Sequence, residues 1–162
     1  MSLVLDGTNG VTFNNSTTQA SAGVVLQVVQ STYSTPASTT STTPAATGLT
    51  ATITPKFSTS KILVIATIQG IQKGLGNGAT GGMFSLYKNG SALATNYAQY
   101  VGYTNTSSIN LPGGNTTNYL DSPATTSATT YAIYFATSVS GQQVIAQADS
   151  DLSTITLMEI AG

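Results

Sequence analysis

The stretch Ser153–Ala161 constrains the fold more than any other, because its apolar side chains would occupy both faces of a β-strand. On a strand, Ile155 and Leu157 point to one face, whereas Met158 and Ile160 point to the other. A strand with two apolar faces needs cover on both sides, which predicts a place in the middle of a sheet. We expect other copies of the chain to cover the second face.

A second stretch, Lys61–Ile68, has the same two-sided pattern. Ile62 and Val64 lie on one face of the predicted strand, and Leu63 and Ile65 lie on the other. We therefore expect this strand to pair with the C-terminal one in an inner sheet. Leu63, Ile65, Met158 and Ile160 become the candidates for an interface between copies.

The rest of the chain predicts an all-β fold. No segment has a convincing helical period, and β-prone runs recur about every ten residues with turn signals between them. Asn89–Gly90 is the clearest two-residue hairpin turn, while Ser31–Gly48 and Leu111–Asn118 read as a surface loop and a glycine-rich turn. This pattern indicates an antiparallel β-sandwich or jelly roll.

The N-terminal part differs in character from the remainder. Two short β-prone runs flank Asp6–Gly10, and a small polar segment follows, which predicts a hairpin and a linker. We expect residues 1–22 to form an attachment extension and residues 23–162 to form the β head. The apolar attachment candidates in the hairpin are Leu3, Leu5, Val11 and Phe13.

The composition excludes several classes of function. Only 6% of the 162 residues are charged, the net charge is −1, and the chain has no Arg, which argues against nucleic-acid partners. Without His or Cys, conventional triad catalysis and thiolate metal sites are absent, so we expect no cofactor and no metal. The start of the chain does not read as a signal peptide, and no stretch predicts membrane insertion.

Three segments carry a resemblance to a known group of proteins. The opening Leu5–Phe13, the closing Ser153–Ile160 and the internal Leu120–Tyr131 resemble segments of tail-fibre and other structural proteins of bacteriophages, including those infecting cyanobacteria. The resemblance implies a homotrimeric virion component with a jelly-roll head similar to the tumour-necrosis-factor and C1q folds. In those folds the C-terminal strand lies in the inner sheet beside the trimer axis, which would make the four interface candidates trimer contacts.

This resemblance implies a non-enzymatic function. The expectation is a tail-fibre or spike subunit, assembled in the host cytoplasm, whose trimeric head attaches to a host surface and whose N-terminus binds other virion proteins. A capsid decoration protein is the first alternative. A small glycan-processing enzyme is the second, resting on Asp149 and Asp151, which would share a face if they lay on a strand.

A tyrosine-rich segment is the candidate receptor-binding surface. A tyrosine offers a flat apolar face for a sugar ring and a hydroxyl group for its rim. Tyr97, Tyr100 and Tyr103 supply such rings, and Gln99 and Asn105 could supply amide hydrogen bonds. These groups would suit a neutral host glycan, with packing into the core or trimer seam as the alternative role of the tyrosines.

Overall fold

The computed structural model describes residues 4–6, 10–12, 18–19, 24–74, 80–104 and 109–162. Side chains are described for residues 24–74, 80–94 and 113–162. The described part consists of strands, turns and one short 3-10 turn, η1 (Ala148–Ser150), and it contains no α-helix. The strands are β1 (Val4–Asp6), β2 (Gly10–Thr12), β3 (Thr18–Gln19), β4 (Val25–Tyr33), β5 (Ala37–Thr39), β6 (Ala45–Ile53), β7 (Lys61–Lys73), β8 (Thr80–Lys88), β9 (Ser91–Thr104), β10 (Ile109–Asp121), β11 (Thr129–Thr137), β12 (Val144–Ala146) and β13 (Ser153–Ile160).

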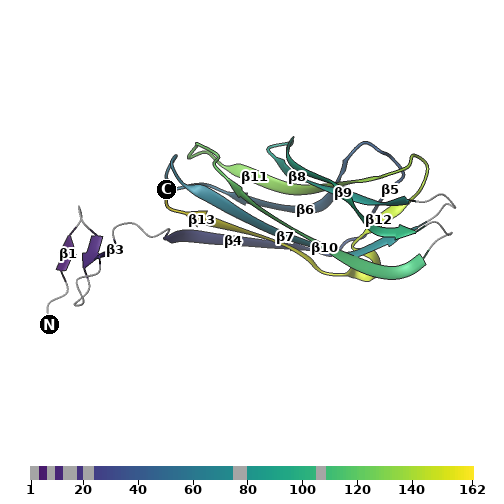
Figure 1. The fold of residues 1–162 in the computed structure, drawn as a ribbon, viewed down its shortest axis with the longest axis horizontal. Helices are drawn as coiled ribbons and strands as arrows, with labels where there is room; N and C mark the ends of the chain where they lie inside the picture. Colours follow the sequence, from purple (N-terminus) through teal and green to yellow (C-terminus); the bar gives the residue numbers. More distant parts are fainter. Residues whose placement is uncertain (1–3, 7–9, 13–17, 20–23, 75–79, 105–108) are drawn as a thin grey trace.

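Ten of these strands form two stacked sheets (Figure 1). The first sheet has the order β4-β13-β7-β12-β5, and β10 pairs with the other edge of β7. The second sheet has the order β6-β11-β8-β9. All the pairings within both sheets are antiparallel. The chain therefore folds as an antiparallel two-sheet β-sandwich of the jelly-roll type, as its sequence predicts.

The C-terminal strand β13 lies in the middle of the first sheet. It pairs with β7 on one side, where Met158 is opposite Leu63, and with β4 on the other, where Met158 is opposite Val28. Both its central position and its pairing with the stretch 61–68 were predicted from the two-sided apolar pattern.

The core lies between the two sheets and follows the alternation of each strand. Along β13 every second residue is buried, and Ile155 and Leu157 have no exposed surface. The second sheet contributes large aromatic side chains, among which Phe84 and Phe135 stack with ring centres 6.0 Å apart. Truncating a side chain of this size would cost about 3–5 kcal/mol, because the surrounding strands cannot close the cavity.

Two expectations about loops were wrong. The stretch 111–118, predicted as a turn, lies inside β10, whose pairing with β7 shifts register around Gly113. The stretch 31–48, predicted as a surface loop, contains the end of β4, all of β5 and the start of β6. In both places pairing with a distant strand overrides the local preference of Gly, Pro and Ser for turns. Pro36 and Pro44 themselves lie outside the strands.

The N-terminal strands form a separate small sheet, β1-β2-β3 (Figure 1). Leu5 and Val11 are opposite each other in the antiparallel pair of β1 and β2. The third strand, Thr18–Gln19, falls in the segment predicted as a linker and pairs with β2.

Candidate functional site

The outer face of the first sheet carries a row of apolar side chains that crosses four strands. Val28, Met158, Leu63 and Leu120 are successive cross-strand neighbours on β4, β13, β7 and β10. Val28 is 55% exposed and Leu120 is 49% exposed, while the two central side chains are half-buried. Cross-strand neighbours on one face contact each other, so these residues form a continuous apolar strip. We refer to it as the apolar row.

The outer face of the first sheet becomes more polar with distance from the apolar row. The next row contains Gln30, Thr156, Ile65 and Asn118. The row after it consists of threonines 32, 154, 67 and 116, and the hydroxyl groups of Thr67 and Thr116 lie 3.1 Å apart. None of these twelve side chains is charged. A face of this kind can meet an identical face without bringing like charges together.

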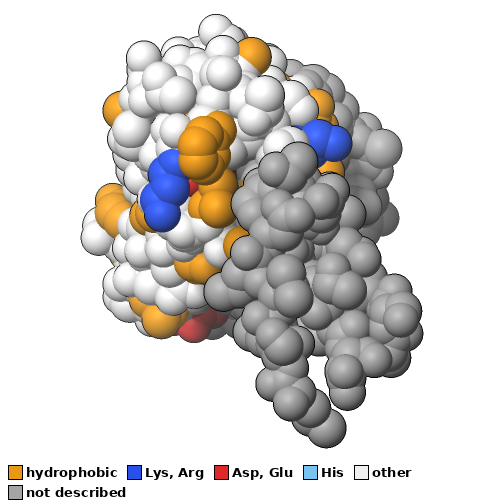
Figure 2. All heavy atoms as spheres, turned by 90° about the vertical axis from the view of Figure 1, so that its left-hand side faces the viewer, with side chains coloured by type: hydrophobic (Ala, Val, Ile, Leu, Met, Phe, Trp, Pro, Cys, Tyr) orange, Lys and Arg blue, Asp and Glu red, His pale blue; other side chains and the backbone are white. Residues whose placement is uncertain are grey.

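The four predicted interface candidates share this outer face. Leu63 and Met158 belong to the apolar row, Ile65 lies in the row beside it, and Ile160 lies opposite Lys61 at the end of the sheet. All four are half-buried in the single chain. The four side chains thus lie on one face of the sheet, and their role as contacts between copies stays a prediction. Figure 2 shows that charged side chains are few on the described surface of one end of the molecule.

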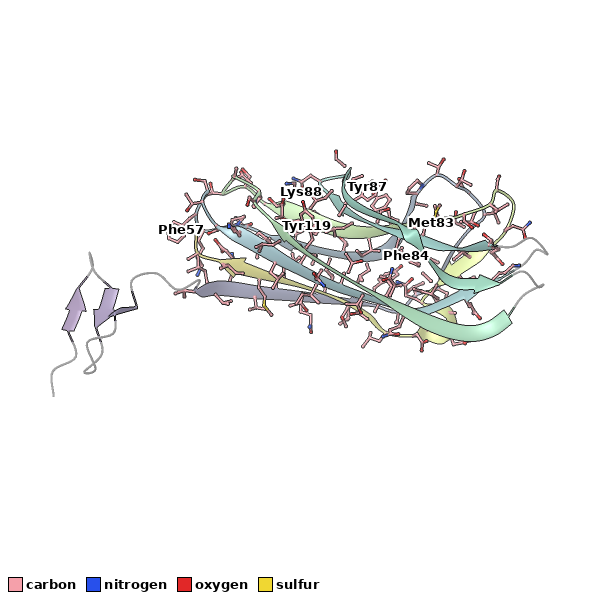
Figure 3. All side chains as sticks on the ribbon, in the orientation of Figure 1. Phe57, Met83, Phe84, Tyr87, Lys88 and Tyr119 are labelled. Carbon is pink, nitrogen blue, oxygen red and sulfur yellow. The ribbon has the colours of Figure 1, made fainter. Side chains whose placement is uncertain are left out.

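A second feature lies on the outer face of the other sheet. Tyr87 of β8 and Tyr134 of β11 stack with ring centres 3.9 Å apart and planes inclined by 17°. Both rings are half-buried. Figure 3 places Tyr87 on the side of β8 away from the first sheet, whereas Phe84 of the same strand lies between the sheets.

Tyr134 also lines a shallow hollow of about 260 Å³. Its floor is made by small residues of two neighbouring strands: Ala46, Gly48 and Thr50 of β6, and Thr130 and Ala132 of β11. The hollow exists because the outward positions of these strands carry side chains with little volume beside one large ring.

The predicted hairpin turn Asn89–Gly90 is confirmed and forms the far end of the hollow. Both residues have positive φ angles, 49° and 81°, as a tight hairpin requires. Asn89 Oδ1 accepts a hydrogen bond of 2.8 Å from the backbone N–H of Thr130, and the backbone N–H of Asn89 donates to the carbonyl of Thr130. These two bonds fix the turn against the start of β11, and Gly90 lines the hollow.

A buried polar cluster joins the sheets. Lys88 lies 3.0 Å from both carboxylate oxygens of Asp121, and the hydroxyl group of Tyr131 donates a 2.7 Å hydrogen bond to the same carboxylate. Burial, this hydrogen bond and the negative charge of Asp121 all raise the pKa of Tyr131, so the phenol stays neutral. Because Lys88 and Tyr131 both bind the Asp121 carboxylate, the cluster links the two sheets and has a structural role.

A second buried carboxylate, Glu159, lies near the end of the first sheet. Gln27 Nε2 and the backbone N–H of Lys56 donate to it at 2.6 and 2.7 Å. Burial favours the protonated form, but the nearby Ser60 hydroxyl, the Gln27 amide and the backbone N–H groups of Lys56 and Phe57 outweigh it and lower the pKa of Glu159. This carboxylate anchors the loop between β6 and β7.

The predicted receptor-binding residues are only partly described. Tyr97, Gln99, Tyr100 and Tyr103 belong to strand β9, and their side chains lie outside the described part, as does the whole of Asn105. Of the predicted attachment residues, Leu5 and Val11 lie in β1 and β2, while residues 3 and 13 lie outside the described part. Sequence reasoning missed the Tyr87–Tyr134 pair, although the inward positions of Tyr131, Ile133 and Phe135 imply that Tyr134 points outward.

The alternative of a small glycan-processing enzyme required Asp149 and Asp151 to share one face of a strand, and the structure does not place them in that way. Asp149 lies in η1 with a φ of 56°, and the backbone N–H of Asp151 donates to the carbonyl of Ala148, so the two residues flank a turn and do not share a strand face. Among the described residues no group of three or more His, Cys, Asp or Glu side chains could hold a metal ion. The described part also has no helix with the length and hydropathy to cross a membrane.

Comparisons with known proteins give only distant structural similarity. No protein-family model matches the chain, and no curated protein matches it. The fold is similar to part of the structure of infectious bursal disease virus, strain Gx, with a TM-score of 0.45 and 14% identity over 99% of this chain and 40% of that one.

Two further structures are similar at lower scores. A mutant VP2 protein of infectious bursal disease virus in derived T=1 particles gives a TM-score of 0.43 and 12% identity over 85% of this chain and 36% of that one. Dimeric latent PorU from Porphyromonas gingivalis gives a TM-score of 0.34 and 11% identity over 98% of this chain and 14% of that one. The chain spans less than half the length of each of these proteins.

Proposed function

We propose that the chain is a structural subunit of a virus particle, whose β-sandwich head associates with copies of itself through the outer face of the first sheet. The observation that carries this proposal is the apolar row together with the two uncharged rows beside it, while the charged Lys61 lies on the same face only at the end of the sheet. Val28 and Leu120 would lose most of their exposed surface in such a contact, and Met158 and Leu63 would become fully buried.

The number of copies follows from the resemblance of the sequence to phage structural proteins, which implies a trimer. In that arrangement the C-terminal strand lies beside the three-fold axis. Strand β13 suits this place, because it is central in its sheet and carries Met158 and Ile160 on the outer face. The low charge of the chain also favours a covered face, since a neutral, exposed β-sheet surface promotes aggregation.

The remaining parts of the proposal assign roles to the ends of the molecule. Residues 1–22 attach the head to other virion proteins, and the head contacts the host surface as part of a tail fibre or spike. The tyrosine-bearing strand β9 stays the proposed receptor-binding segment, in which the aromatic rings of Tyr97, Tyr100 and Tyr103 would pack against the receptor.

The oligomeric state tests the self-association. Sedimentation velocity and light scattering of the intact chain should give three times the chain mass of 16.4 kDa. The substitution Met158→Lys places a charge in the apolar row and should yield monomers, because an unpaired charge cannot be buried between copies. The control Thr52→Lys places the same charge on the exposed outer side of β6 and should leave the trimer intact. A wild-type monomer in dilute solution would overturn the self-association.

Immunogold labelling of intact particles with an antibody against this chain tests the virion role. Label at the tail or spike tips is expected from a fibre subunit. Label over the whole shell would instead assign the chain to capsid decoration. Absence of label from particles whose host cells contain the chain would refute both roles.

A further inference from the structure

We propose that the hollow beside Tyr134 binds one ring of a neutral saccharide. The hollow lies on the outer face of the second sheet, opposite the face proposed for self-association. The proposal therefore does not rest on the oligomeric state, and the two can fail separately.

The shape of the hollow suits a single ring. Its volume of about 260 Å³ is below the roughly 300–1,000 Å³ typical of pockets for larger, drug-sized ligands. Ala46, Gly48 and Ala132 keep the floor low, and Tyr134 rises beside them as a wall. A flat apolar floor with one aromatic wall matches the apolar C–H face of a pyranose.

The aromatic wall is held in place before a ligand arrives. Tyr87 stacks on Tyr134 at 3.9 Å, which restricts the ring that also lines the hollow. A preorganised ring loses little conformational entropy when a ligand packs against it. Figure 3 shows Tyr87 on the outer side of its strand, so its own ring extends the aromatic surface beyond the hollow.

Polar groups at the rim can serve sugar hydroxyl groups as both donors and acceptors. Asn89 does not itself line the hollow but adjoins two residues that do, Gly90 and Thr130; its Oδ1 atom accepts from the backbone N–H of Thr130, and its amide group keeps two N–H donors. Thr50 donates its hydroxyl hydrogen to the carbonyl of Tyr131 and keeps its oxygen as an acceptor. The Thr130 hydroxyl group lies 2.7 Å from that of Thr52 and can accept a further hydrogen bond.

The electrostatics select an uncharged ligand. Among the described residues that line the hollow, the phenol of Tyr134 is the one ionisable group. Lys88, which precedes the hairpin turn, points to the interior side of β8, where its ammonium group is bound by both oxygens of Asp121. An anionic ligand would find no free cation among the lining residues, so a neutral sugar is favoured over a phosphate or an acidic sugar.

Saturation-transfer NMR with defined sugars tests the site. The probes are the methyl glycosides of glucose, galactose, mannose and N-acetylglucosamine, with methyl glucuronide as the charged comparison. We expect at least one neutral glycoside to bind with a Kd on the order of 1 mM, as befits a small exposed site. Tyr134→Ala should weaken that binding by about tenfold or more, whereas Tyr134→Phe should retain most of it.

A matched pair of substitutions keeps the test valid if Tyr134→Ala does not fold. Ala46→Met fills the floor of the hollow and should abolish binding, while Ala45→Met adds the same side chain at the neighbouring exposed position, which does not line the hollow, and should leave binding unchanged. Thermal unfolding of both variants checks their folding. The proposal is overturned if no neutral glycoside binds, if the glucuronide binds best, or if Ala46→Met binds as well as the wild type.

Discussion

Lys88 Nζ lies 3.0 Å from each carboxylate oxygen of Asp121, and this ion pair joins the two sheets of the sandwich. Lys88 ends strand β8 of the second sheet, and Asp121 ends strand β10 of the first. Asp121 is buried and Lys88 is partly exposed, so the aspartate is the member that most needs its partners. The Tyr131 hydroxyl group supplies the second partner from β11.

We expect Asp121→Ala to lower the free energy of unfolding by about 2–4 kcal/mol, because it leaves a lysine and a buried tyrosine hydroxyl without their acceptor. Tyr131→Phe should cost less, about 1–2 kcal/mol, because it removes a single hydrogen bond. Urea unfolding of the two variants measures both values. A triple variant, Lys88→Met, Asp121→Leu and Tyr131→Phe, removes all three polar partners and should recover much of the loss, and failure to recover it would mean that the cluster contributes more than its own desolvation cost.

The acid sensitivity of the fold should depend on Glu159. Hydrogen bonds lower its pKa below the ordinary value of 4.5, so between the two values the unfolded chain binds more protons than the folded one. The contribution of Glu159 to stability is therefore complete above about pH 4.5 and is lost as the pH falls through the folded-state pKa.

Thermal unfolding between pH 7 and pH 3 should show this loss in the wild type. Glu159→Gln should be less stable than the wild type at pH 7, and the difference between the two proteins should shrink on acidification. A difference that stays constant over this range would contradict the assignment.

The pairing of the two long apolar strands could be predicted because it leaves a local signal. Alternation with period two placed Leu63 and Met158 on outward faces, and the structure makes them direct neighbours. Strand β10 could not be predicted in the same way. Its glycines favour turns locally, and its pairing with β7 holds it extended.

The features of the candidate sites also differ in how far they could be predicted, because some depend on adjacent residues and others on residues far apart in the sequence. The Asn89–Gly90 turn is encoded in two adjacent residues and was predicted correctly. The Tyr87–Tyr134 stack depends on the register between β8 and β11, and the Lys88–Asp121 pair joins residues 33 positions apart in different sheets. No local pattern specifies either contact.

Gln147 should be replaceable with a gain in stability. Its side chain is fully buried, and neither its amide oxygen nor its nitrogen has a hydrogen-bond partner among the described residues. Gln147→Met keeps nearly the same shape and removes both unsatisfied polar atoms, which should raise the free energy of unfolding by about 1–2 kcal/mol. Calorimetry would then record a melting temperature higher by roughly 2–8 °C. A lower melting temperature would indicate that a buried water molecule satisfies the amide.

Gly48 and Gly90 allow the cost of backbone conformation to be separated from the cost of crowding. Both have positive φ angles, 92° and 81°, which an alanine adopts at a cost of roughly 1–2 kcal/mol. A Cβ atom at Gly90 would meet no atom of the described residues within 4 Å, whereas one at Gly48 would overlap the ring of Tyr33. We therefore expect Gly90→Ala to destabilise the protein by about 1 kcal/mol and Gly48→Ala by an additional 1–3 kcal/mol or so, because the tyrosine must repack. Urea midpoints of the two variants measure the difference. Equal losses would mean that Tyr33 moves aside at no cost, and the double variant Gly48→Ala with Tyr33→Ala would then show no relief of the Gly48 penalty.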